Sequence, residues 1–193
     1  MAGAFGLFTR VFGKGAFSAS PPVSVVPPAS LRRAASQRLS PSGRAALRRL
    51  EGVVAHAYKD SGGRLTIGVG HLLSSGELQR GTVNIAGTLV SWRGELTSDQ
   101  VDQLLGQDAA WAERDVAEHV DVALTQQQFD ALVIFVFNVG PTAFGKSTLL
   151  RQLNAGKYAS IPAQLARWVY DDGKKSKGLV YRRAQEAAIW RSA

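Results

Sequence analysis

The stretch Glu51-Gly-Val-Val-Ala-His-Ala-Tyr-Lys-Asp60-Ser-Gly-Gly-Arg-Leu-Thr66-Ile-Gly-Val-Gly-His71 places two carboxylates and a hydroxyl around a glycine-rich turn. Ser40-Pro41 ahead of it is typical of a helix start, and Leu47 shares a helix face with Glu51, four residues on. The glycine that follows Glu51 predicts that the helix ends there. Short extended pieces at 55–59 and 64–69 flank Asp60 and its glycines, which indicates a hairpin beside the helix end.

The sequence downstream becomes helical after a second predicted hairpin at 82–85 and 88–92. Thr97-Ser-Asp-Gln and Thr125-Gln-Gln-Gln are capping boxes that open helices, and the second helix is apolar on all sides, which is typical of a central buried helix. Shorter helices are predicted at 147–154, at 162–170 with Ser160 as its cap, and at 179–190. The fold class is therefore α+β, with a small strand-rich lobe followed by a larger helical lobe.

The charge of the chain is concentrated at its front. Residues 1–50 hold eight of the 23 cations and no acid, so the rest is formally neutral, with 15 cations and 15 acids. Residues 20–30 carry four of the seven prolines and read as a linker. We expect residues 1–39 to form a basic, flexible leader, which is a solubilising tail, an anchor to a virion component or an arm for an anionic surface, and residues 40–193 to form one domain.

Composition excludes several classes of function. There is no Cys, and the three histidines are scattered, so neither thiol chemistry nor a metal or other cofactor is expected. The apolar opening is only nine residues long before Arg10, and the longest uncharged run, 131–145, has 15 residues. Both are too short for a membrane span, and the opening does not match a signal peptide.

Several ordered motifs resemble the phage-type lysozymes, glycoside hydrolase family 24. They are the opening stretch, Leu124-Thr-Gln-Gln-Gln-Phe-Asp-Ala-Leu-Val-Ile-Phe-Val-Phe-Asn-Val-Gly140, Ser147-Thr-Leu-Leu-Arg-Gln-Leu-Asn-Ala-Gly156 and Gly178-Leu-Val-Tyr-Arg-Arg-Ala184. The resemblance covers about residues 40–193. It implies a lysozyme-like fold with a substrate cleft between the two lobes, and an endolysin that cleaves the β-1,4 bond between N-acetylmuramic acid and N-acetylglucosamine.

The resemblance also implies the roles of the opening triad. Glu51 would be the general acid, while Asp60 and Thr66 would orient a water on the opposite face of the sugar and invert the anomeric carbon. Physical chemistry agrees with this division of roles. Apolar neighbours and the negative end of a helix favour a protonated Glu51, whereas a polar turn keeps Asp60 ionised.

Further residues are assigned by the resemblance alone. His71 and Asp108 would form a structural ion pair, and Arg183, or alternatively Arg182, would face the catalytic glutamate. The substrate-binding residues would be Gly70, Leu72, Phe137, Asn138 and Arg183. Compared with the minimal family pattern, the segment at 73–96 is long and the basic leader is an addition.

Two other functions compete with this prediction. Gly140-Pro-Thr-Ala-Phe-Gly145-Lys146-Ser147 matches the phosphate-loop pattern, which requires a preceding parallel strand; the capping box at Thr125 instead predicts a helix there. A lysozyme-like domain could also serve as a non-catalytic peptidoglycan-binding or virion-binding module. Such a module would not need the triad of Glu51, Asp60 and Thr66.

The expected partners follow from these predictions. They are the glycan strands of peptidoglycan and, through residues 1–39, an anionic outer membrane or wall polymer; no nucleic acid is expected, and the chain should be a monomer. Without a signal peptide or membrane span, the protein should accumulate in the host bacterial cytoplasm before lysis and act in the periplasm on the cell wall.

Overall fold

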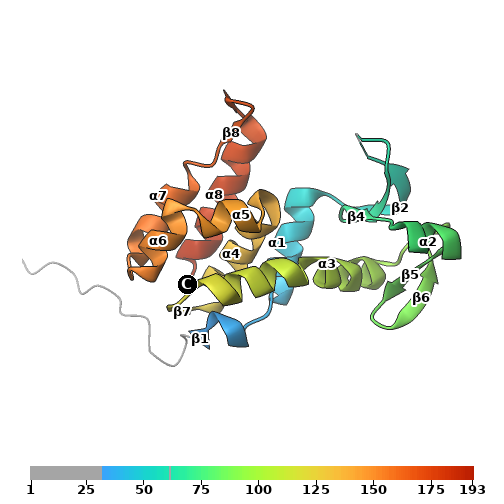
Figure 1. Cartoon of the computed structure of the whole chain (residues 1–193), viewed down its shortest axis with the longest axis horizontal. Helices are drawn as coiled ribbons and strands as arrows, with labels where there is room; N and C mark the ends of the chain where they lie inside the picture. Colours follow the sequence, from blue (N-terminus) through green and yellow to red (C-terminus); the bar gives the residue numbers. More distant parts are fainter. Residues whose placement is uncertain (1–31, 61) are drawn as a thin grey trace, which may run out of the picture.

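The computed structural model describes residues 32–60 and 62–193 (Figure 1). The helices are α1 (Pro41–Glu51), α2 (Ser75–Arg80), α3 (Ser98–His119), α4 (Gln126–Val139), α5 (Pro141–Gly145), α6 (Thr148–Asn154), α7 (Ile161–Leu165) and α8 (Lys177–Arg191), with 3-10 turns η2 (Ala34–Ser36) and η3 (Tyr158–Ser160). The strands are β1 (Arg32–Arg33), β2 (Val54–Lys59), β3 (Leu65–Gly68), β4 (His71–Leu72), β5 (Thr82–Ile85), β6 (Thr88–Ser91), β7 (Ala123–Leu124), β8 (Tyr170–Asp171) and β9 (Lys174–Lys175). This is the predicted α+β class.

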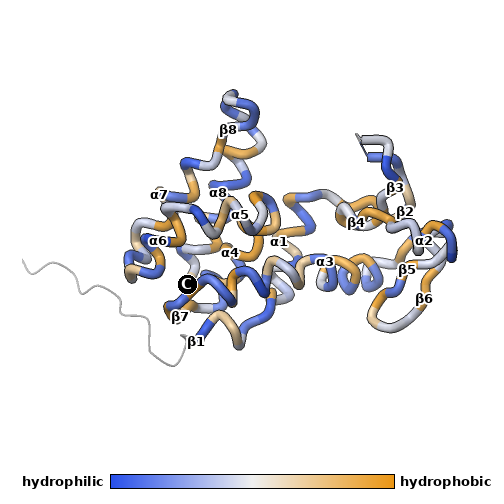
Figure 2. The backbone as a smooth tube through the Cα atoms, viewed as in Figure 1, coloured by the Kyte–Doolittle hydropathy of each residue, from blue (hydrophilic) through white to orange (hydrophobic). Residues whose placement is uncertain are grey.

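Helix α4 is the centre of the helical lobe. Its residues from Gln128 to Val136 are all buried, and it packs against α8, α3 and α1. The predicted capping box opens it: Thr125 Oγ1 accepts from the Gln128 amide at 3.2 Å, and Gln128 Oε1 accepts from the Thr125 amide at 3.0 Å. Figure 2 shows the hydrophobic colouring on α4, surrounded by more hydrophilic outer helices. Burial on all sides explains the continuous apolar sequence.

The strand-rich lobe is a three-stranded antiparallel sheet, β2-β3-β4, beside the separate hairpin β5-β6. In the predicted β2-β3 hairpin, Tyr58 pairs with Thr66 and Lys59 with Leu65. Gly63, in the turn, has φ +76°, a conformation that glycine adopts without strain. The 22-residue helix α3 runs along both lobes and holds the sheet lobe against the helical lobe (Figure 1).

One predicted helix is shorter than expected. The helix predicted at 162–170 ends at Leu165, and Ser160 does not cap it, because its hydroxyl donates to the Lys157 carbonyl at 2.7 Å. The helix ends in bonds to the third preceding residue, from the Arg167 amide to Gln164 O at 3.3 Å and from the Trp168 amide to Leu165 O at 3.0 Å. Beyond it the chain has tertiary partners: Arg183 Nε donates to Trp168 O at 3.0 Å, and the Ser176 amide donates to Val169 O at 2.8 Å. The short ladder β8-β9 replaces the last turns.

Residues ahead of the predicted domain boundary at Ser40 are packed against the domain. Strand β1 pairs with β7, and Ala34 and Leu39 are buried. The Leu39 amide donates to Glu113 Oε1 at 2.8 Å, which ties this segment to α3. Apolar side chains with satisfied amides belong to a packed surface rather than to a flexible leader. The remainder of the predicted leader lies outside the described residues.

Within residues 32–60 and 62–193, no helix is both long enough and apolar enough to cross a membrane.

Candidate active site

Glu51 is the last residue of α1, as predicted. Ser40 caps this helix by accepting from the Gly43 amide at 3.0 Å, and Pro41 occupies its first position. Gly52 ends it with φ +83° and ψ 163°, a backbone conformation almost confined to glycine. The Glu51 side chain is 26% exposed, so a ligand can reach it.

Arg182 of α8 contacts Glu51 directly. Its Nη2 donates to Glu51 Oε1 at 2.7 Å, and the same nitrogen donates to the Ile134 carbonyl at 3.3 Å. Of the two arginines that the sequence offered, Arg182 therefore faces the glutamate and Arg183 does not. The surroundings of Glu51 are also less apolar than predicted, because a guanidinium group shares the helix end with Leu50.

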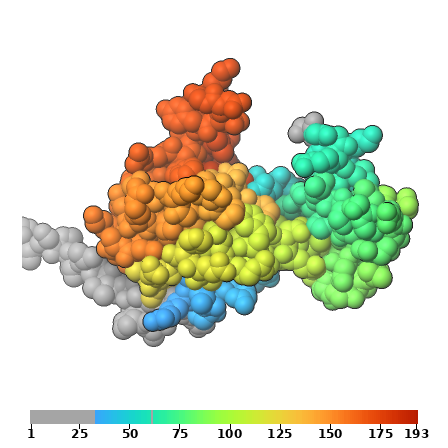
Figure 3. All heavy atoms as spheres, in the orientation of Figure 1, coloured from blue at the N-terminus to red at the C-terminus, as the bar shows by residue number. Residues whose placement is uncertain are grey.

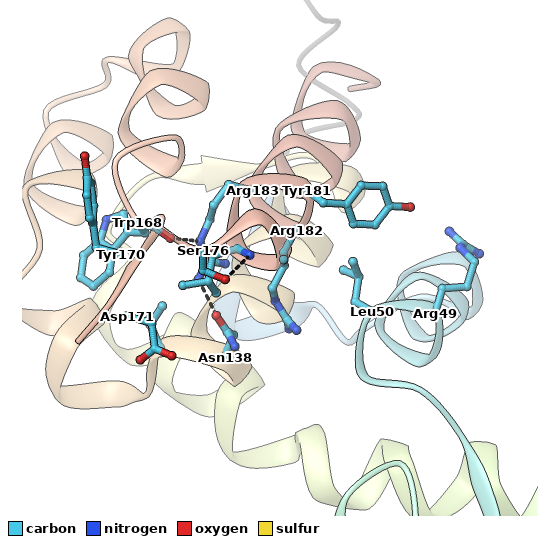
Figure 4. Close-up of a pocket in the computed structure, with 13 residues that line it drawn as sticks. Arg49, Leu50, Asn138, Trp168, Tyr170, Asp171, Ser176, Tyr181, Arg182 and Arg183 are labelled. Carbon is cyan, nitrogen blue, oxygen red and sulfur yellow. Dashed lines mark hydrogen bonds between the residues drawn. The ribbon is translucent and has the colours of Figure 1, made fainter. Parts of the chain in front are cut away.

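Behind Arg182 lies a buried ionic cluster that the sequence analysis did not identify. Glu186 is fully buried; its Oε1 accepts from Arg182 Nε at 3.1 Å and from Arg183 Nη1 at 2.6 Å. Arg183 also donates to Asn138 Oδ1 at the end of α4. Figure 4 shows Arg182 and Arg183 leaving the same helix, with Asn138 joined to Arg183. The Arg-Arg-x-x-Glu spacing on one helix was the signal that could have revealed this cluster.

Asp60 lies at the start of the β2-β3 turn. Its Oδ1 accepts from the amides of Gly62 and Arg64, both at 2.9 Å, and Arg64 Nε donates to its Oδ2 at 3.1 Å. The Arg64 amide, with the other donors, holds the pKa of Asp60 below its usual value despite some desolvation. The predicted ionised aspartate in a polar turn matches this arrangement.

Thr66 is in β3 and only 3% exposed. Its hydroxyl donates to the Arg64 carbonyl at 3.3 Å, which leaves its acceptor lone pairs available. Thr66 and Asp60 are thus connected through one residue, Arg64. In the described part of the chain, no hydrogen bond or ion pair joins either of them to Glu51.

His71 and Asp108 form the predicted pair, with 2.9 Å between His71 Nδ1 and Asp108 Oδ1. A third member, Glu77, was missed: its Oε1 lies 3.3 Å from His71 Nε2. Burial lowers the pKa of His71, but Asp108 and Glu77 outweigh it and raise that pKa above its usual value. The capping-box pattern Ser74-x-x-Glu77 was the available signal for Glu77, which also accepts from the Ser74 amide at 2.8 Å.

Two hollows hold the predicted substrate-binding residues. One, of about 400 Å³, is lined by Gly70, Leu72 and Phe137, together with His71 and Asp108. The other, of about 670 Å³, is lined by Asn138, Arg182 and Arg183, with Trp168 and Tyr170 on its far wall (Figure 4). Figure 3 shows the surface hollowed between the β2-β3 hairpin, in teal, and the region of β8 and α8, in red.

The phosphate-loop pattern at 140–147 does not have the context that nucleotide binding requires. The segment before Gly140 is helix α4, not a parallel strand, and the described sheets are all antiparallel. Residues 141–145 form the short helix α5. The pattern is therefore a connection between helices.

One carboxyl group at the end of a helix and another in a hairpin turn, in an α+β fold of two lobes, are the parts expected of a glycoside hydrolase of the lysozyme class. Comparison of the sequence with known protein families gives the same class. The family model described as phage lysozyme matches residues 48–186, and the chain belongs to this family.

Relatives and solved structures agree with this assignment. The SAR-endolysin of Escherichia phage Mu is 40% identical over 147 residues, covering 76% of this chain and 77% of the relative. The endolysin of Salmonella phage P22 is 36% identical over 155 residues, covering 80% and 99%. A crystal structure of a P22 lysozyme mutant has a TM-score of 0.68 at 34% identity, covering 80% of this chain and 99% of that chain.

A similar structure also comes from outside phages. The muramidase domain of SpmX from Asticaccaulis excentricus has a TM-score of 0.64 at 30% identity and covers 79% of this chain and 97% of that chain. Together with the family, these similarities make the protein a lysozyme, an enzyme that hydrolyses peptidoglycan in phage host lysis.

Proposed function

We propose that the enzyme cleaves the β-1,4 bond between N-acetylmuramic acid and N-acetylglucosamine with inversion, using Glu51 as general acid and Asp60 as general base. The proposal rests on the different surroundings of the two carboxyl groups. Glu51 is partly exposed at a helix end, whereas Asp60 is held ionised by turn amides and Arg64. Carboxyl groups in unlike environments are suited to separate acid and base roles.

In this mechanism, Asp60 and Thr66 hold the attacking water. Ionised Asp60 accepts a proton from the water, and the Thr66 hydroxyl, already donating to Arg64 O, accepts the water's second hydrogen. Glu51 protonates the glycosidic oxygen as that bond breaks. An inverting pair is roughly 6.5 to 9.5 Å apart, so that a water fits between the acid and base positions.

The sugar-binding residues complete the proposal. Gly70, Leu72 and Phe137 would contact one part of the glycan and Asn138 another, in the two hollows they line. Arg183 would act mainly through Asn138, because its donors are already engaged by protein acceptors. The glycan would thus cross the surface past Glu51.

Product stereochemistry tests the mechanism. NMR of a soluble glycan digest, recorded before mutarotation, should show the α-anomer first; a β-anomer as first product would overturn inversion.

The isosteric variant Glu51→Gln should lose at least about a hundredfold in rate while still binding glycan. If wild-type protein binds peptidoglycan but never cleaves it, the non-catalytic module is the better description.

The route of the enzyme is a further part of the proposal. We propose that it stays in the host cytoplasm as a monomer before lysis and acts at the cell wall afterwards, with the basic residues 1–39 attracted to an anionic outer membrane or wall polymer. Deleting residues 1–31, which spares the packed segment from Arg32 on, should preserve activity on bare peptidoglycan and reduce it on intact Gram-negative cells. The difference should shrink with salt, because screening acts over about 8 Å at physiological ionic strength.

A further inference from the structure

The buried cluster behind Glu51 contains more charge than packing requires. Glu186 is 0% exposed, and the side chains of Arg182 and Arg183 are 7% and 2% exposed. Taking ions out of water is costly, and apolar side chains in their place are often as stable or more stable. Stability alone is thus a weak explanation for two arginines and a glutamate at this position.

The geometry shows what Glu186 does to Arg182. The Nε edge of that guanidinium donates to Glu186 Oε1 at 3.1 Å, and Nη2 donates to Glu51 Oε1 at 2.7 Å. A guanidinium group is planar and its donors have fixed directions, so fixing Nε also fixes the direction of Nη2. Glu186 therefore aims Arg182 at the carboxyl group of Glu51.

Glu186 also affects the charge around Glu51. Arg183 Nη1 contacts both oxygens of Glu186, at 2.6 and 2.8 Å, so Glu186 is shared by two cations. Counted with Glu51, the group holds two guanidinium groups and two carboxyl groups. Without Glu186, the positive charges of two guanidinium groups would act on the Glu51 site unopposed.

We infer that Glu186 is a positioning residue for catalysis, which holds Arg182 against Glu51 and offsets the charge of the arginine pair. This inference rests on the proposed role of Glu51 as general acid. Glu186 does not touch the substrate, since it has no exposed surface.

The test is the pH dependence of kcat/KM on a soluble glycan, measured for charge variants of the cluster. The proposed mechanism needs a protonated general acid, so activity should fall on the alkaline limb of the pH profile. Glu186→Gln should move this alkaline limb to lower pH by about one unit, and lower kcat more than it changes KM. Arg183→Gln removes a cation instead, and should move the limb to higher pH.

The double variant Arg183→Gln with Glu186→Gln restores the charge balance. Its alkaline limb should return close to that of the wild type, although neither residue is native. Leu153→Ala, a buried change in α6, is the control for lost stability: it should lower the melting temperature and leave the limb in place. If Glu186→Gln does not fold, Arg183→Gln and the double variant still provide the comparison.

The outcomes separate the two proposals. An alkaline limb that stays within about 0.2 pH units in all folded cluster variants would overturn the role of Glu186. Glu51→Gln tests the proposed function independently: if that variant keeps wild-type activity, Glu51 is not the acid. If it is inactive while the cluster variants leave the limb unmoved, only the inference about Glu186 fails.

Discussion

Gly52 and Gly140 end two different helices with the same backbone geometry. Gly52 closes α1 with φ +83° and ψ 163°, and Gly140 closes α4 with φ +81° and ψ 163°. A Cβ built at either position meets no atom within 4 Å. Any cost of a side chain there would come from backbone strain alone, which makes the two glycines a matched pair.

Alanine at these two positions should separate stability from activity. Gly52→Ala and Gly140→Ala should each reduce the free energy of unfolding by roughly 1 to 3 kcal/mol, because this conformation is essentially restricted to glycine. Only Gly52→Ala changes the turn directly beside Glu51, so it should also lower kcat by about tenfold or more. Urea unfolding and turbidity assays measure the two effects; equal loss of activity in both variants would contradict the prediction.

Arg182→Lys should show that the directions of the hydrogen-bond donors of residue 182 matter for activity, and not its positive charge alone. Lysine keeps the positive charge but lacks the planar set of donors that reaches Glu51, Glu186 and Ile134 O together. We expect roughly a tenfold decrease in kcat. Arg191→Lys, at the exposed end of the same helix, is the control and should match the wild type. A fully active Arg182→Lys enzyme would show that a point charge is enough.

The contacts of His71 with Asp108 and Glu77 should make the stability of the fold depend on pH. Burial lowers the pKa of His71, but Asp108 and Glu77 outweigh it and raise that pKa above its usual value, so protonated His71 stabilises the fold. This contribution is fully present below about pH 6.5 and is lost as pH rises through the higher pKa of the folded state. Melting temperatures between pH 5.5 and 8.5 should therefore decrease for the wild type.

Two variants check the origin of that slope. Asp108→Asn removes the partner at 2.9 Å and should flatten the decrease, while His56→Gln, at an exposed histidine, should leave it unchanged. If Asp108→Asn keeps the wild-type slope, another group is responsible for it.

Asp130 should be one of the most important polar residues for folding. It is 2% exposed, and it accepts from the Ser40 amide at 3.0 Å and from Gln126 Nε2 at 2.8 Å. Asp130→Ala removes the acceptor of the Ser40 amide and one of the two acceptors of Gln126 Nε2, so we expect a loss of roughly 1 to 3 kcal/mol in denaturant unfolding. Glu118→Ala, on the exposed side of α3, should change stability by less than about 0.5 kcal/mol. A similar small change for Asp130→Ala would contradict this assignment.

Features set by neighbouring residues could be predicted from the sequence. The α1 start at Ser40, the hairpin around Asp60 and the capping boxes at Thr97 and Thr125 are in the structure as expected. Each depends on side chains that hydrogen-bond to the backbone within a few residues. The resemblance also pointed correctly to the contact between His71 and Asp108.

Features that depend on distant contacts were missed or misplaced. The helix predicted at 162–170 ends at Leu165, and the chain beyond it is held by a distant residue, Arg183 of α8, which donates to the Trp168 carbonyl. Both Arg182 and Arg183 had the residue type that could face Glu51, and only packing of α8 against α4 decides between them. Strand β1 pairs with β7, about 90 residues away, so no local pattern marks residues 32–39 as folded.

The strand pair β1-β7 also determines how the molecule can be held. Trp190, near the end of α8, stacks on Tyr158, whose hydroxyl donates to the carbonyl of Ala123, and Ala123 pairs with Arg33. The two ends of the described residues 32–193 are thus linked through two side-chain contacts and one strand pair, away from the hollow between the hairpin β2-β3 and α8 (Figures 1 and 3). A carrier or solid support attached at either of these ends would lie on the opposite side of the enzyme from the surface that is proposed to bind the glycan. That surface would stay accessible.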